Sequence, residues 1–144
     1  MSVLSRLRKK EKGQAMVEFA LVLPILIGLI CGIIDFGWLF YNYLSLQNAC
    51  REGARRACVI SQDAECEATV KKKVIDMLPE GLKGSADVHV TFSNNSSMED
   101  RIKGEVTVTT EANIYFLTPV LGTVYKEKNG GKKITSTLVM KVES

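Results

Sequence analysis

The chain has 144 residues, of which 46% are hydrophobic and 24% are charged, and its formal net charge is +3. The first thirteen residues hold five basic side chains and one acidic side chain, so the remaining residues carry a charge of about −1. The positive charge is therefore a property of the N-terminus. It gives no evidence for nucleic-acid binding, and no nucleic-acid partner is expected.

A basic leader, residues 1–13, precedes the longest apolar stretch of the chain. No charged residue occurs from Phe19 to Ile34, and the apolar run from Ala15 to Ile34 has about the length that crosses a bilayer core as a helix. A basic flank holds its end of such a helix in the cytoplasm. The pattern predicts a leader at 1–13, a transmembrane helix at 14–41 and an extracytoplasmic domain at 42–144. The expected location is the inner membrane, crossed once and in contact with its lipid.

Two simpler interpretations compete for this stretch. A secretory signal peptide would end in a small-x-small cleavage site, but residues 35–41 read DFGWLFY. A plain single-pass anchor would carry Glu18 as an incidental residue near its cytoplasmic end. A carboxylate at the head of a membrane helix is costly, which makes Glu18 a candidate functional residue.

The outer end of the apolar stretch is rich in aromatic residues. Asp35 falls near the outer face of the membrane, and the rings around it match an interfacial belt. Pro24 removes a helical hydrogen bond inside the span and predicts a kink or local loosening there.

The helix is expected to continue beyond the membrane, from Gln14 to about Ala57, which gives a length of roughly 66 Å. Ala49, Gly53 and Ala57 recur every four residues and form a smooth ridge, against which a sheet or another helix can pack closely. Glu52 is spaced to pair with Arg55 and Arg56 on a solvated face.

A second helix is predicted at Asp63–Leu78. Its apolar side would hold Val70, Val74, Met77 and Leu78, its lysines at 71–73 would face solvent, and Pro79, Gly81 and Gly84 would end it.

Three strands follow, each with alternating apolar residues. The first covers 86–92, the second 105–116, and the third has inward residues at 134, 138, 140 and 142. A polar loop, residues 93–97, and a turn at 129–131 separate them. The predicted fold class is α+β: a long N-terminal transmembrane helix that continues into a small extracytoplasmic domain with a second helix and an antiparallel sheet of about three strands.

The four cysteines fit an exported domain. Cys31 lies in the span, whereas Cys50 and Cys58 are two turns apart on one helix, about 12 Å and too far to bridge. Cys58 and Cys66 flank a short link where the chain must turn, so they are the expected disulfide in an oxidising exterior. No CxxC pair accompanies them, and we expect no metal site and no cofactor.

The search for catalytic residues yields no candidate. The chain has one histidine, His89, on the polar face of a predicted strand, and it lacks the GxSxG and HExxH motifs. The sequence does not indicate an enzyme.

Four segments in the N-terminal half resemble one family in combination. They are residues 13–24 (GQAMVEFALVLP), 35–37 (DFG), 47–49 (QNA) and 51–55 (REGAR). This combination is similar to the TadE-like family, the pseudopilins or minor pilins of the tight-adherence (Tad/Flp) type IV pilus system.

The resemblance implies roles for three residues. Gly13 would be the last residue of the leader, Gln14 the N-terminus after cleavage by a prepilin peptidase, and Glu18 the glutamate that acts in assembly. The new amine at Gln14 and the Glu18 carboxylate could pair between neighbouring subunits, although cyclisation of Gln14 would remove that amine. The implied partners are the prepilin peptidase, other pilin-like subunits and pilus assembly proteins.

The alternative is a membrane protein of another class. It would be an uncleaved single-pass protein whose extracytoplasmic domain binds or senses a ligand, and the mature N-terminus distinguishes it from a processed pilin-like subunit.

Overall fold

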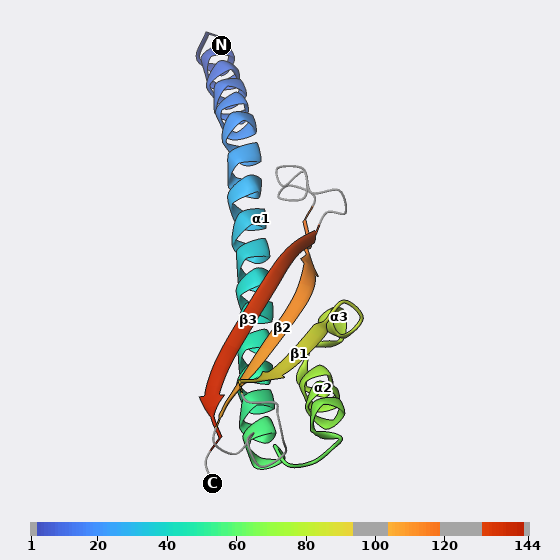
Figure 1. The fold of residues 1–144 in the computed structure, drawn as a ribbon. Coiled ribbons are helices and arrows are strands. Elements are labelled where there is room, and N and C mark those ends of the chain that lie inside the picture. Colours follow the sequence, from blue (N-terminus) through green and yellow to red (C-terminus); the bar gives the residue numbers. More distant parts are fainter. Residues whose placement is uncertain (1–2, 94–103, 119–130, 143–144) are drawn as a thin grey trace.

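The computed structural model describes residues 3–93, 104–118 and 131–142. In chain order the elements are α1 (Val3–Val59), α2 (Cys66–Met77), α3 (Glu80–Lys83), β1 (Asp87–Phe92), β2 (Glu105–Tyr115) and β3 (Gly131–Lys141). Figure 1 shows α1 running the length of the molecule, with the other elements gathered along its C-terminal half. The predicted α+β class is confirmed.

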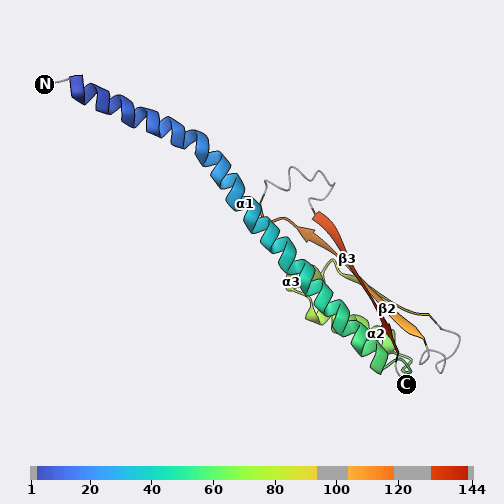
Figure 2. The same ribbon diagram turned by 90° about the vertical axis from the view of Figure 1, so that its left-hand side faces the viewer.

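Helix α1 is one continuous helix of 57 residues, longer at both ends than the predicted Gln14–Ala57. Its N-terminal extension consists largely of lysine, arginine, leucine and glutamate, which are all good helix formers. Pro24 lies inside the helix without ending it. Figure 2 shows α1 bending within its N-terminal half, the half that holds this proline, as expected from a missing backbone hydrogen bond.

The head, which we define as residues 42–142 of the described chain, is built in two layers. α1 packs under β2 and β3, and α2 packs beside α1 under β1. The predicted ridge forms the centre of this contact, because Ala49, Gly53 and Ala57 are all buried. Close approach at Gly53 is extreme: a Cβ atom there would lie 2.4 Å from Cγ2 of Val74 in α2 and 3.7 Å from Cγ1 of Val108 in β2.

Helix α2 is shorter than predicted, since it begins at Cys66 and not at Asp63. Residue 65 is the N-cap but makes no side-chain cap bond, and the preceding residues form turns. Val70, Val74 and Leu78 are buried as predicted, whereas Met77 is 43% exposed, so its placement on the apolar side was wrong. At this end of α2 it is Leu78, and not Met77, that packs into the core.

The helix break also differs from the prediction. Pro79 does end α2, but it then serves as the N-cap of α3, and Gly81 lies inside that one-turn helix. Leu82 is buried in this helical turn, and its burial stabilises the turn that precedes β1. Lys72 and Lys73 face solvent as predicted, while Lys71 is half-buried.

The sheet is antiparallel with the order β1-β2-β3. Its alternation follows the sequence pattern, with one face on the helices and a polar face outward. β2 ends at Tyr115, one residue before the predicted end. Of the predicted connections, most of the polar loop at 93–97 and the first two residues of the turn at 129–131 lie outside the described residues.

Candidate functional site

The predicted processing and assembly residues lie on one exposed stretch of α1. Gly13, Gln14 and Glu18 are all exposed, and an added Cβ at Gly13 would meet no atom within 4 Å. Gln14 and Glu18 are about one helical turn apart, and the Gln14 side-chain amide donates to Glu18 Oε1 at 3.4 Å. Within the described chain the other carboxylate oxygen, Oε2, accepts no hydrogen bond. Glu18 therefore has an oxygen available to a neighbouring group.

The apolar stretch that follows contributes no residue to the core of the head. Residues 13–27 are exposed without interruption, for example Met16 at 75% and Ile25 at 72%, and most large apolar residues up to Ile34 are exposed as well. This part of α1 is long and apolar enough to cross a membrane, with a mean hydropathy of 2.6. Because exposed apolar surface of this extent is unfavourable in water, the stretch is compatible with a membrane anchor.

Asp35, at the far end of this stretch, is a site that sequence reasoning did not find. The side chain is fully buried, and the backbone N–H groups of Leu117 and Thr118 each donate to Oδ1 at 3.0 Å. The Thr118 hydroxyl donates to Oδ2. These three donors compensate a buried carboxylate and attach the segment after β2 to α1. The available signal was a lone acidic residue at the end of an apolar run.

Two carboxylates thus flank the apolar stretch of α1. Glu18 and Asp35 are seventeen residues apart, or about 26 Å along a helix, close to the thickness of a bilayer core. Their surroundings differ, since the first is open to a neighbour and the second is satisfied by its own chain. Of the two, Glu18 is exposed and Asp35 is buried.

The two cysteines predicted to form a disulfide lie at the end of α1 and the start of α2. The Cys66 thiol is buried 4.0 Å from the carbonyl oxygen of Ala57, the residue before Cys58. Cys58 is half-buried, with its thiol 3.6 Å from the carbonyl oxygen of Lys141. Cys50 is held differently, because its buried thiol donates to backbone oxygens of Val108 and Ser136.

The Cys58–Cys66 disulfide stays a prediction for the exported protein. Closing this loop of about nine residues would add roughly 2–3 kcal/mol to the free energy of unfolding on the loop-entropy model. Peptide mapping under non-reducing conditions should recover the linked pair. Recovery of Cys50 linked to Cys66 would contradict the prediction.

The charged cluster on α1 is a solvated ion pair. Arg55 donates to both Glu52 oxygens, at 2.9 and 2.8 Å, which confirms one of the two predicted pairings. This hydrogen bond lowers the pKa of Glu52 and raises the pKa of Arg55. Arg56 influences the Glu52 pKa only through its charge. An exposed pair of this kind stabilises the fold little.

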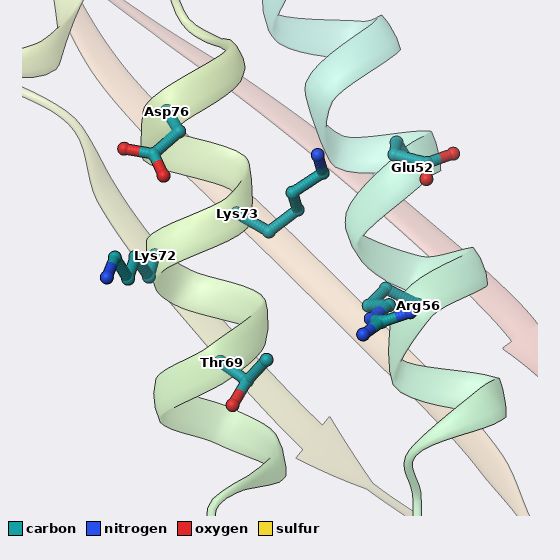
Figure 3. A pocket seen from close by; sticks show the side chains of 6 residues that line it. All are labelled: Glu52, Arg56, Thr69, Lys72, Lys73 and Asp76. Carbon is teal, nitrogen blue, oxygen red and sulfur yellow. The ribbon is translucent and has the colours of Figure 1, made fainter.

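A shallow groove lies between α1 and α2 beside this pair, lined by Glu52, Arg56, Thr69, Lys72, Lys73 and Asp76. Figure 3 shows Arg56 and Lys73 extending into the space between the helices from opposite sides, while Lys72 and Asp76 point away. The arrangement offers two cations but no nucleophile beside a general base, so it does not resemble a catalytic site.

His89 lies on the outer face of the sheet, as predicted. Its side chain is exposed, with Nε2 3.2 Å from Asp87 Oδ2. Across the described residues, no three His, Cys, Asp or Glu side chains are grouped to hold a metal ion.

Comparison with known proteins identifies the N-terminal part of the chain. The family model of TadE-like proteins matches residues 13–55, which confirms the resemblance over that segment. The match covers the residues predicted for processing, the apolar stretch, and Ala49 and Gly53 of the buried ridge, and it supports a structural, Tad-pilus-associated protein in general terms. No curated protein and no solved structure matches the chain.

Proposed function

We propose that this protein is a membrane-anchored pseudopilin or minor pilin that takes part in assembling tight-adherence pili. In this proposal a prepilin peptidase cleaves the chain after Gly13, so that the mature protein begins at Gln14. The apolar part of α1 lies in the inner membrane with the leader in the cytoplasm, and the head lies outside. Other pilin-like subunits are its partners.

The observation that carries the proposal is the separation of α1 into two halves. Among the described residues, the half before Asp35 supplies none of the hydrophobic core, whereas the half after it forms the spine of that core. A free apolar helix can pack against the helices of other subunits in a bilayer or a filament. The TadE-like match covers both halves, from Gly13 to Arg55.

Glu18 supplies the electrostatic part of assembly. Its Oε2 atom is available, and cleavage after Gly13 would create a positively charged amine on each neighbouring chain. A charge near the membrane edge is poorly solvated, so a neighbour that neutralises it is favoured over one that does not. The arrangement in which the amine of one subunit lies beside Glu18 of the next is thereby favoured over other arrangements of the subunits.

Substitution of Glu18 tests this role. We expect Glu18→Ala to insert in the membrane and to be cleaved, yet to lose most pilus production and most co-purification with partner pilins. Glu18→Asp should do less harm where the shorter side chain still reaches. Glu18→Gln is the matched control, because it keeps the size and the hydrogen bond to Gln14 but removes the charge. It should behave like Glu18→Ala.

The alternative, an uncleaved anchor with a sensing or binding head, makes a different prediction. In that case Glu18 simply extends toward the cytoplasmic interface, and all three variants assemble pili normally. Normal piliation and normal partner capture by Glu18→Ala would therefore reject the assembly role.

A further inference from the structure

The segment that follows β2 is attached to α1 at one position along the helix, Asp35. Asp35 accepts hydrogen bonds from the amides of Leu117 and Thr118 and from the Thr118 hydroxyl, and its side chain is fully buried. In Figures 1 and 2 the end of β2, together with the start of β3 that pairs with it, is the part of the sheet that lies nearest the N-terminal half of α1. The position of Asp35 along α1 therefore also sets the position of this end of the sheet along α1.

Large apolar side chains are exposed around this junction on both elements. On α1, Phe36 is 67% exposed and Phe40 54% exposed, and their rings stack with centroids 6.4 Å apart. On the head, Tyr115 is 56% exposed and Leu117 59% exposed. Along the chain, each of these four residues lies within five positions of Asp35 or of one of its donors, and exposed apolar residues of this kind mark a contact surface.

The height of this zone follows from the length of α1. If Glu18 lies at the inner edge of the membrane, Asp35 lies about 26 Å further along the helix, at the outer edge. Tyrosine rings are favoured at headgroup depth, and leucine and phenylalanine side chains can insert at the boundary between headgroups and acyl chains. The charge of Asp35 does not oppose this depth, because three donors from the head already satisfy it.

We propose that the head touches the outer face of the membrane through Leu117 and Tyr115, at headgroup depth, and that Asp35 is the positioning residue that holds them there. The inference rests on the membrane anchorage in the proposed function and adds a second point of contact. Two contacts, one through α1 and one through the end of β2, restrict the tilt of the head relative to the bilayer. The head is then presented to neighbouring subunits in a defined orientation.

Single-tryptophan fluorescence in lipid vesicles tests this inference, because Trp38 is the chain's one tryptophan. The full chain carries Trp38→Phe together with one probe: Leu117→Trp, Leu26→Trp in the apolar stretch, or Val139→Trp. Val139 is the matched control, since it is similarly exposed at 53% but pairs with Thr107, toward the other end of the sheet. Vesicles of phosphatidylcholine and phosphatidylglycerol contain chains brominated near the headgroup or near the bilayer centre.

The expected result is a loss of Leu117→Trp emission that is largest with bromines near the headgroup. Leu26→Trp should be quenched best by deep bromines, and Val139→Trp should not be quenched. Adding Asp35→Ala should reduce the quenching of the Leu117 probe and leave that of the Leu26 probe unchanged.

Other outcomes overturn separate parts of the proposal. Quenching of Leu26→Trp without quenching of Leu117→Trp leaves the anchor intact but rejects the second contact. A Leu117 probe shielded from aqueous acrylamide yet insensitive to bromines has a protein neighbour in place of lipid, and it also rejects the contact. Equal quenching of Val139→Trp rejects the assignment to the end of β2, and undiminished quenching with Asp35→Ala rejects the positioning role. Absence of quenching at Leu26 rejects the membrane anchorage itself.

Discussion

Gly13→Leu should leave the protein as an uncleaved precursor, heavier than the processed form by about thirteen residues. Gly13 lies inside the continuous helix α1, so the bond after it must leave the helical conformation before a peptidase can act on it. Leucine is more favourable than glycine in a helix interior by up to about 1 kcal/mol, so the substitution alone makes local opening of the helix a few-fold rarer. The leucine side chain also blocks close approach of the peptidase to the backbone.

Mass spectrometry of protein recovered from membranes measures this effect directly. Gly28→Leu is the control, because Gly28 lies in the same helix, has open space around it and is remote from the bond to be cut. It should be processed normally, and Gly13→Ala should be intermediate. Wild-type protein that still begins at Met1 in cells carrying the peptidase would contradict the processing proposal.

Gly53→Ala should destabilise the head, although alanine is the better helix former. The new methyl group would lie 2.4 Å from Val74 Cγ2 and 3.6 Å from Val70 Cγ1. Val74 is fully buried and β-branched, so it cannot rotate away freely, and α2 must shift to make room. Overpacking typically costs ~1–3 kcal/mol, and the gain in helix propensity offsets up to ~1 kcal/mol. We expect a net loss of about 1–2 kcal/mol in the free energy of unfolding.

Denaturant unfolding of the full chain in detergent micelles gives this number. Gly37→Ala is the matched control, since a Cβ there meets no atom within 4 Å and the substitution should be neutral or slightly stabilising. A double-mutant cycle with Val74→Ala isolates the clash, because Gly53→Ala should lose most of its cost once the valine methyl groups are absent. An equal cost in both backgrounds would show that the close contact is not the cause.

Features that depend on local sequence could be predicted without the structure. The apolar stretch is an unbroken run of uncharged, mostly apolar residues, and each strand alternates apolar with polar residues. The placement of each residue can therefore be predicted from its neighbours. The ridge at Ala49, Gly53 and Ala57 could likewise be recognised as a close-packing face from its spacing. Glu18 could be singled out because a carboxylate at the head of such a stretch is costly wherever the chain folds.

The partners of these faces were decided only by tertiary structure. The spacing of the ridge did not distinguish a sheet from a helix, and the structure places Val74 of α2 and Val108 of β2 together at Gly53. Met77 followed the helical period but is exposed, because α2 ends beside it and the core contact passes to Leu78.

Asp35 shows the same limit most clearly. Its sequence position placed it at the outer end of the span, but its donors lie about eighty residues away along the chain. No local period relates residues so distant, and only the packing of the sheet on α1 brings them within hydrogen-bonding distance. The sequence therefore determined which part of the chain is free to meet a membrane and other subunits, whereas the tertiary structure decided how the head is held against it.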